Sequence, residues 1–147
     1  IVKRRAEKPI TTTGELVDIV SYAVPSHVRR EGNPARLTFQ ALRMAVNREQ
    51  EELSHLLQVL PDVMAPGGRV AIISFHSLED RMVKQAMKRW ESPCDCPRDF
   101  PVCVCKKKPL GRCLTGKPIV ADAAECRGNR RARSAKLRVF EFGEVEV

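Results

Sequence analysis

The feature that most constrains this fold is a short apolar run enclosed by two turns. The Pro-Gly-Gly at residues 66–68 suits a tight turn, because proline fixes φ and glycine accepts positive φ at little cost. Residues 69–75 are then β-branched or apolar on both faces, which is typical of a strand buried on both sides in a parallel sheet. Ser77, with Asp80 three residues later, resembles a capping box, so we expect a helix to begin near Leu78.

A strand, a short polar turn and a helix form the unit of an open α/β sheet, so this chain is predicted to be an α/β protein. Ligands of such sheets bind at the carboxyl ends of the strands. Ser74, Phe75, His76 and Ser77 fall at that end of the predicted strand. These residues are therefore the first place to look for chemistry.

Helical spacing of apolar residues recurs on both sides of this unit. The predicted helices cover residues 14–24, 37–46, 48–60 and 78–90. Thr12 or Thr13 is expected to cap the first helix, and Pro61 to kink or restart the third. We expect a polar loop over residues 26–34 and a final strand over residues 136–142, with one partly exposed edge.

The net charge of +8 is concentrated toward the carboxyl end. Residues 106–138 hold eleven lysines and arginines against Asp122 and Glu125, so this segment carries +9. A one-sided basic segment is typical of a protein that binds a polyanion, most often nucleic acid. A solvated basic surface is the alternative. No run reaches the roughly 18 apolar residues of a membrane span, so we expect no membrane association.

Four of the six cysteines form two Cys-x-Cys pairs, Cys94 with Cys96 and Cys103 with Cys105. Four thiolates can hold a tetrahedral zinc ion and thereby order a loose loop. Reduced thiols are the alternative, because ligand pairs in structural zinc sites are usually separated by two residues or more. The chain is too long for a disulfide-stapled mini-protein and shows no secretion signal, so we expect a reducing, cytoplasmic setting.

Five blocks of sequence occur in an order and at a spacing that resemble one family. They are Lys8-Pro-Ile-Thr-Thr-Thr-Gly-Glu-Leu16, Thr38-Phe-Gln-Ala-Leu-Arg-Met-Ala-Val-Asn47, Ala65-Pro-Gly-Gly-Arg69, Ile73-Ser-Phe-His-Ser-Leu-Glu-Asp-Arg81 and Arg131-Ala-Arg-Ser-Ala-Lys-Leu-Arg138. Each block alone is weakly specific, but five in order across almost the whole chain are strongly specific. Together they resemble the carboxyl-terminal half of the RsmH (MraW) family, bacterial methyltransferases that act on cytosine N4 in small-subunit rRNA.

The resemblance implies a partial class I S-adenosylmethionine-dependent methyltransferase, with a Rossmann-like doubly wound sheet and an inserted helical domain. Residues 1–43 would be the end of that helical domain. Residues 44–147 would be the carboxyl-terminal half of the methyltransferase domain, with an irregular cysteine-rich and basic loop at residues 91–117. The implied reaction is N4-methylation of a cytidine in 16S rRNA, with the small ribosomal subunit as partner. The resemblance also admits a homodimer of the full-length protein.

The sequence departs from the family pattern at the cofactor site. In the family, that site lies in the amino-terminal half, where a glycine-rich turn follows the first strand and acidic residues hold the ribose. The eight glycines of this chain include no Gly-x-Gly pattern. We therefore expect no residues that bind S-adenosylmethionine in this chain, and we expect it to be a fragment that is inactive alone.

Methylation of a cytosine amine depends on positioning, aided by groups that accept hydrogen bonds from the amine hydrogens. Ser74 and His76 carry suitable groups at the carboxyl end of the predicted strand and are the candidate catalytic residues. The alternative is structural: Ser77 caps the following helix and His76 bonds to nearby backbone.

Two groups of polar residues are predicted to bind the RNA. The first comprises Arg36, Arg43 and Asn47, for which an ordinary polar helix face is the alternative. The second belongs to the basic segment and comprises Arg130, Arg131, Arg133, Ser134 and Lys136. Arginine and lysine position RNA through its phosphates without reading sequence. The alternative is that some of these arginines pack across the sheet onto the missing half of the protein. A non-catalytic RNA-binding module that uses this segment is the alternative function.

Overall fold

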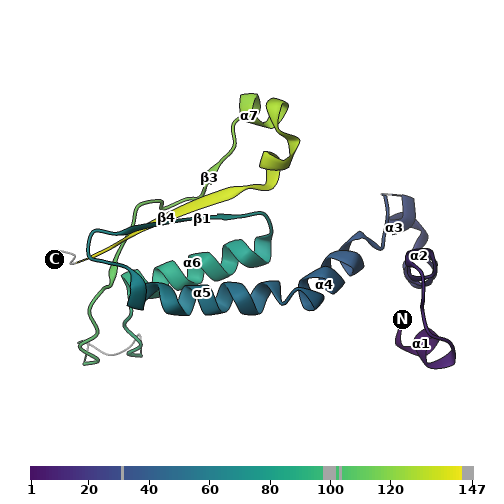
Figure 1. The fold of residues 1–147 in the computed structure, drawn as a ribbon, viewed down its shortest axis with the longest axis horizontal. Coiled ribbons are helices and arrows are strands. Elements are labelled where there is room, and N and C mark those ends of the chain that lie inside the picture. Colours follow the sequence, from purple (N-terminus) through teal and green to yellow (C-terminus); the bar gives the residue numbers. More distant parts are fainter. Residues whose placement is uncertain (31, 98–101, 103, 144–147) are drawn as a thin grey trace. The chain divides into compact units, whose positions relative to one another are not determined.

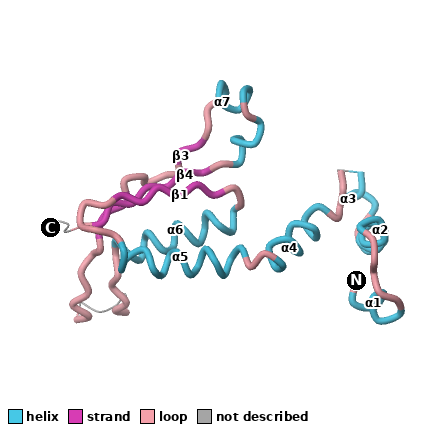
Figure 2. Tube along the Cα trace, in the orientation of Figure 1, coloured by secondary structure: helices cyan, strands magenta, loops and turns pink. Residues whose placement is uncertain are grey.

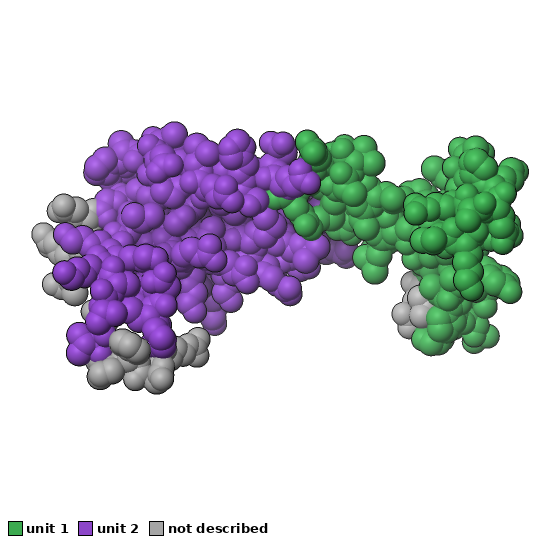
Figure 3. Space-filling view, turned by 90° about the horizontal axis from the view of Figure 1, so that it is seen from below, with its two compact units in different colours: residues 1–50 green, residues 51–147 purple. Residues whose placement is uncertain are grey.

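The computed structural model describes residues 1–30, 32–97, 102 and 104–143, which form helices followed by an α/β region (Figures 1 and 2). The elements are α1 (Val2–Glu7), α2 (Thr13–Ala23), α3 (Ser26–Arg30), α4 (Arg36–Val46), α5 (Glu49–Val63), β1 (Arg69–Ser74), α6 (Ser77–Glu91), β2 (Gly111–Cys113), β3 (Ile119–Val120), α7 (Ala123–Gly128), the 3₁₀ helix η1 (Arg130–Ser134) and β4 (Lys136–Phe142). Two compact units, Ile1–Gln50 and Glu51–Val147, are coloured separately in Figure 3. The assignment of residues 1–43 to an inserted helical domain stays a prediction.

The first unit is helical, and a capping box begins its best-defined helix. The hydroxyl of Thr12 accepts a hydrogen bond from the backbone N–H of Glu15 at 3.2 Å, and the Glu15 carboxylate accepts one from the backbone N–H of Thr12 at 3.0 Å. The predicted cap at Thr12 is therefore confirmed. The apolar residues that pack this unit are Leu16, Val20 and Ala35.

The predicted loop over residues 26–34 is wrong in part, because α3 (Ser26–Arg30) occupies its first five residues. Pro25 explains both the end of α2 and the start of α3. A proline disfavours helical geometry at the residue before it but is compatible with the first turn of a new helix. The Pro25 carbonyl accepts a hydrogen bond from the backbone N–H of Arg29 at 3.4 Å.

The sheet of the second unit is built around β4. The strand order is β1-β4-β2, with β3 also paired to β4, and all three pairings are antiparallel. The expectation that residues 69–75 form a parallel strand buried on both faces is wrong for the described residues, since β1 alternates between exposed and covered side chains. The partly exposed edge expected for the final strand is also wrong, because β4 is paired on both sides. Apolar β-branched residues favour a strand but do not fix its direction or its neighbours.

The strand directions nevertheless include one feature of an α/β fold, which is a helix that connects two strands of the same direction. Because β1 and β2 both run antiparallel to β4, they run in the same direction as each other, and α6 lies between them in the chain. Figure 1 shows α5 and α6 side by side beneath the sheet. The α/β class is therefore observed, although the only pairings among the described strands are antiparallel.

One apolar cluster joins α5, α6 and β4. Its buried members are Leu57, Leu60, Val83, Met87, Trp90, Phe140 and Phe142. The Trp90 ring centroid lies 5.3 Å from that of Phe140 and 5.2 Å from that of Phe142, in edge-on and tilted contacts that aromatic rings favour. The helices therefore cover the face of β4 that bears Phe140 and Phe142.

Two helix boundaries differ from the sequence prediction. The helix α5 continues through Pro61 to Val63, so it does not restart there. The helix α6 begins at Ser77, and its N-cap is His76 instead of Ser77. Within the described part of the chain, we find no helix with the length and apolar character needed to cross a membrane.

Candidate functional site

The carboxyl end of β1 passes into α6 through Phe75 and His76, and Glu79 fixes this turn. One carboxylate oxygen of Glu79 accepts hydrogen bonds from the backbone N–H of Phe75 at 2.9 Å and of His76 at 3.1 Å. These donors have no partner within the helix itself, and a negative charge is favourable at a helix N-terminus. The sequence prediction assigned this capping role to Asp80. A glutamate three residues after His76 was the signal that could have identified the correct pair.

Both predicted catalytic residues lie at this end of β1. Ser74 is the last residue of the strand, is 4% exposed and lies opposite Lys136 of β4. The His76 side chain is 20% exposed, and its Nδ1 lies 3.1 Å from the second carboxylate oxygen of Glu79. A carboxylate this close to a ring nitrogen restricts the orientation of the imidazole. The turn can therefore hold a histidine ring in a defined place at the sheet edge where α/β proteins bind ligands.

Asp80, the next residue of α6, forms a buried ion pair with β4. Its Oδ1 accepts a hydrogen bond from Arg138 Nε at 2.7 Å, and its Oδ2 accepts one from the Arg138 guanidinium at 3.2 Å. Lys136 Nζ donates to the same Oδ2 at 3.4 Å. Asp80 is 9% exposed and Arg138 is 7% exposed. The hydrogen bond from Arg138 holds the pKa of Asp80 below its usual value.

This pair shows which residues of the basic segment are accessible for the predicted contacts with RNA. Arg138 is buried and joins β4 to α6, so it is not an exposed ligand for phosphate. The Lys136 side chain is 39% exposed while it contacts Asp80, so it stays accessible from solvent. Arg138 therefore serves the fold through a contact within this chain.

The remaining predicted RNA-binding residues of the second unit lie together in η1. Arg130, Arg131, Arg133 and Ser134 are all exposed. Asn129 begins this helix, since its side-chain oxygen accepts a hydrogen bond from the backbone N–H of Arg131 at 3.1 Å. Ala132, which is 6% exposed, is the buried contact of the helix. Three guanidinium groups on one short exposed helix can contact neighbouring phosphates without reading bases.

In the first unit, Arg43 and Asn47 converge on Glu49. Arg43 Nε donates to the Glu49 carboxylate at 3.0 Å, and Asn47 Nδ2 donates to the same oxygen at 3.3 Å. These contacts join the end of α4 to the start of α5, and they offset the positive charge of Arg43. Arg36, at the start of α4, is exposed. The structure thus places the three residues on α4 and its end, and gives two of them a structural contact.

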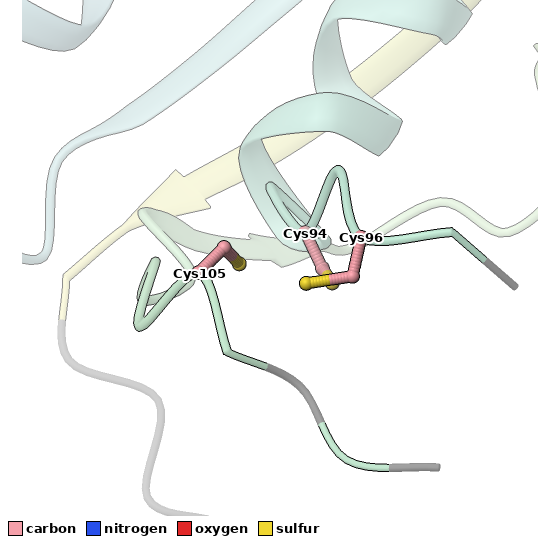
Figure 4. Close-up of side chains that lie close together, drawn as sticks. All are labelled: Cys94, Cys96 and Cys105. Carbon is pink, nitrogen blue, oxygen red and sulfur yellow. The ribbon is translucent and has the colours of Figure 1, made fainter. Parts of the chain in front are cut away.

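Three of the four predicted zinc ligands lie together. The Sγ atoms of Cys94, Cys96 and Cys105 are all within 4.8 Å of one another (Figure 4). No disulfide bond links the cysteines that the structure describes. Cys103 lies outside the described residues. The residues that follow α6 and the residues that precede β2 therefore meet at a cluster of sulfur atoms, and we call them the two arms of this stretch.

The turn after β1 differs from the glycine-rich turns that bind nucleoside cofactors. The turn after β1 is Phe75 and His76, without glycine, and its backbone N–H groups are bonded to Glu79. A glycine-rich turn is what lets backbone N–H groups approach such a cofactor. The turn can thus present side chains to a substrate, but it does not offer the backbone cradle of a cofactor.

The sequence is similar to known proteins over nearly its whole length. The pattern of the MraW methylase family matches residues 1–143. A relative from Symbiobacterium thermophilum, named "Ribosomal RNA small subunit methyltransferase H", is 55% identical over 139 residues. Relatives with the same name from Carboxydothermus hydrogenoformans and Heliobacterium modesticaldum are 52% and 53% identical. The matches cover 94–96% of this chain but 44–45% of the relatives, so the chain spans less than half the length of these curated relatives.

Proposed function

This chain belongs to the MraW methylase family, and from that premise we propose that it forms the carboxyl-terminal part of an S-adenosylmethionine-dependent rRNA methyltransferase. The observation that carries the proposal is the 52–55% identity, across almost the whole chain, to relatives named as methyltransferases of small-subunit ribosomal RNA. The proposed reaction transfers a methyl group to the exocyclic N4 of a cytidine in 16S rRNA.

The sheet is compatible with the closing strands of a class I methyltransferase. The strands β1 and β2 run in one direction, and β4 runs in the opposite direction between them. Doubly wound sheets commonly carry an antiparallel strand near one edge of an otherwise parallel sheet. In this proposal, the other strands of the sheet belong to the part of the protein that precedes this chain.

The cofactor site is assigned to that preceding part. S-adenosylmethionine supplies an electrophilic methyl group when it is bound. The turn after β1 does not fit such a site, because it lacks glycine and its backbone donors are bonded to Glu79. The role of this chain is therefore to position the nucleotide that receives the methyl group.

His76 and Ser74 are proposed to serve the acceptor base. Glu79 restricts the His76 ring from one side, and the strand end fixes Ser74. A ring nitrogen or a hydroxyl oxygen that accepts a hydrogen bond from the amine would hold its lone pair toward the incoming methyl carbon. Because these groups are fixed before the base arrives, little conformational entropy is lost when it binds.

The exposed arginines of η1 are proposed to hold the rRNA backbone. Arg130, Arg131 and Arg133 offer positive charge, and Ser134 and Lys136 extend the same segment toward β4. Arg36, Arg43 and Asn47 are proposed as a second contact on α4, weakened at Arg43 by its bond to Glu49. The exposure of η1 also favours the alternative of a non-catalytic RNA-binding module, which would hold RNA without transferring a methyl group.

A chimera tests the proposal directly. The amino-terminal part of the Symbiobacterium thermophilum relative would be joined to this chain and incubated with small ribosomal subunits and radioactive S-adenosylmethionine. We expect label in N4-methylcytidine after the rRNA is digested to nucleosides. A folded chimera that binds rRNA but labels no cytidine would contradict the methyltransferase and support the RNA-binding module.

The role of His76 is tested in the same chimera. We expect His76→Asn to lower kcat by about a hundredfold, the usual scale for a group that handles a proton or hydrogen bond in the transition state. Asparagine is a good N-cap, so α6 should keep its start and the melting temperature should change little. The matched control is His55→Asn, an exposed histidine on α5. Equal activity of the two variants would remove His76 from the site.

A further inference from the structure

In segment 92–110, which lies between α6 and β2, no described residue belongs to the apolar core of the second unit. The ends of this segment meet, because the backbone N–H of Leu110 donates to the Trp90 carbonyl at 2.8 Å. Between these ends, no described residue is buried, and Val102 and Val104 are 70% and 63% exposed. Figure 1 shows its two described arms, residues 92–97 and 104–110, extending away from the helices and the sheet. A stretch of this length needs another source of order to offset its conformational entropy.

The sulfur atoms at the base of this segment have the spacing of a metal site. In tetrahedral zinc coordination with bonds of about 2.3 Å, neighbouring sulfur atoms lie about 3.8 Å apart. The Sγ atoms of Cys94, Cys96 and Cys105 lie within 4.8 Å of one another, so small side-chain rotations would bring them to that distance. Figure 4 shows the side chain of Cys105 directed at those of Cys94 and Cys96. The one-residue gap between Cys94 and Cys96 therefore does not keep their sulfur atoms apart.

Charged residues beside the cysteines link the same two arms. Lys107 Nζ donates to the Asp95 carboxylate at 2.6 Å, and Asp95 stands between Cys94 and Cys96 in the chain. An ammonium group at this place would offset the excess negative charge that several thiolates bring to a divalent ion.

The backbone next to Cys105 is held in an uncommon conformation. Lys106 has a φ of 53°, in the left-handed region that residues other than glycine rarely adopt. The chain also bends at Cys96 and at Cys105. A strained residue directly after a cluster of side chains indicates that the surroundings fix the local geometry.

We propose that Cys94, Cys96 and Cys105 bind one zinc ion that holds the two arms of segment 92–110 together. Ligand sets made of thiolates select zinc, and a mononuclear ion fits the single cluster of sulfur atoms. Three protein thiolates leave the fourth position of the tetrahedron to another ligand. The ion has a structural role and takes part in no redox step. The inference does not depend on the proposed methyltransferase activity.

The first experiment measures metal in the unsubstituted chain. The protein would be purified under reducing conditions without chelator and analysed by elemental mass spectrometry. We expect about one zinc ion per chain. After removal of zinc, titration with Co²⁺ should give the visible and ultraviolet absorption bands of tetrahedral cobalt bound to thiolates. A metal-free protein that is folded, reduced and without these bands on cobalt addition would overturn the proposal.

Substitutions then assign the ligands. Cys94→Ser, Cys96→Ser and Cys105→Ser should each weaken zinc binding at least tenfold. The matched controls Cys113→Ser and Cys126→Ser, which change cysteines outside the cluster, should keep the zinc. The fluorescence of Trp90, the only tryptophan, reports whether the core stays folded in each variant. If both Cys94→Ser and Cys105→Ser still bind zinc, the assignment is overturned. If these variants unfold, the cobalt titration of the unsubstituted chain tests the proposal.

Discussion

Two regions of the second unit are held together by different means. Around β4, the rings of Trp90, Phe140 and Phe142 pack with centroids 4.9–5.3 Å apart, and Asp80 binds Arg138 out of solvent. In segment 92–110, no described residue is buried, and the contacts are an exposed ion pair and a cluster of sulfur atoms. The first region depends on burial, and the second depends on a few polar contacts.

The difference follows from composition. Each large apolar side chain that β4 and α6 bury is worth roughly 1.5–3 kcal/mol, and several of them share one cluster. Segment 92–110 is rich in proline, lysine and cysteine, so it has little apolar area to bury. The stability of the sheet region should therefore depend on its packing and its buried charges. The order of segment 92–110 should instead depend on bound metal and on the state of its thiols.

The largest effect on the sheet region is expected from Asp80→Ala. This change leaves Arg138 buried without its carboxylate, and breaking a buried pair costs about 3–5 kcal/mol of the free energy of unfolding. Urea unfolding followed by Trp90 fluorescence measures the loss. The control Asp62→Ala, at an exposed position of α5, should cost less than about 0.5 kcal/mol. Equal costs for the two variants would show that the buried pair does not stabilise this region.

The next effect is expected where the two regions join, at Gly111. A Cβ at this position would clash with the Glu141 carbonyl oxygen and would lie 2.7 Å from the Phe140 ring. Gly111→Ala should therefore separate β2 from β4 and cost about 1–3 kcal/mol. Thermal melting measures the loss, and Gly116→Ala is the control, because a Cβ there meets nothing within 4 Å. A melting temperature unchanged by Gly111→Ala would show that β2 is not packed against β4.

Acid should lower the free energy of unfolding of the sheet region, because it protonates the Asp80 carboxylate. The folded pKa of Asp80 is lowered by Arg138, so its contribution is present above the unfolded pKa of about 3.9. The contribution is lost as the pH falls below that value, through the folded pKa. Unfolding free energies measured between pH 6 and pH 3 (roughly the range that spans this titration) should therefore fall less in Asp80→Asn than in the unsubstituted protein. Parallel curves would contradict this assignment.

The smallest effect distinguishes cysteines in the two regions. Burial raises the pKa of the Cys113 thiol to about 11, and the neighbouring Glu91 carboxylate adds to the shift. At pH 8, Cys113 is then almost wholly protonated and should react with iodoacetamide about a hundredfold more slowly than an ordinary thiol, whose pKa is about 8.5. Mass spectrometry of the labelled peptides measures the rates. Cys94 should become reactive when a chelator is added, whereas Cys113 should not change.

The same comparison explains how far the sequence could predict the structure. The alternation of residues 136–142 identified the strand, because burial in a strand repeats with the period of its backbone. The direction and neighbours of β1 could not be predicted, since its partner β4 lies far away in the chain and both faces of β1 are apolar. The local sequence thus indicates where a strand lies, but it does not indicate which strand pairs with it.

The position of the candidate catalytic residues in the fold was predicted in outline, and their role stays a prediction. Ser74 and His76 lie at the carboxyl end of β1, as the strand–turn–helix pattern indicates. The cap was assigned to the wrong pair, because Ser77 with Asp80 and His76 with Glu79 have the same three-residue spacing. The use of Arg138 inside the fold could not be predicted, since its partner Asp80 is 58 residues away in the chain. The meeting of Cys94 and Cys105 is a further long-range contact, which spacing suggested but could not establish.

The proposed division of labour between this chain and the rest of the methyltransferase is tested most directly by calorimetric titration with S-adenosylhomocysteine, the product of the cofactor. The chain alone should give no binding heat even at millimolar ligand, because its turn after β1 is closed by Glu79. The chimera that carries the amino-terminal part of the relative should bind the ligand with a stoichiometry of about one. Tight stoichiometric binding to the chain alone would contradict the account and would place the cofactor site among these residues.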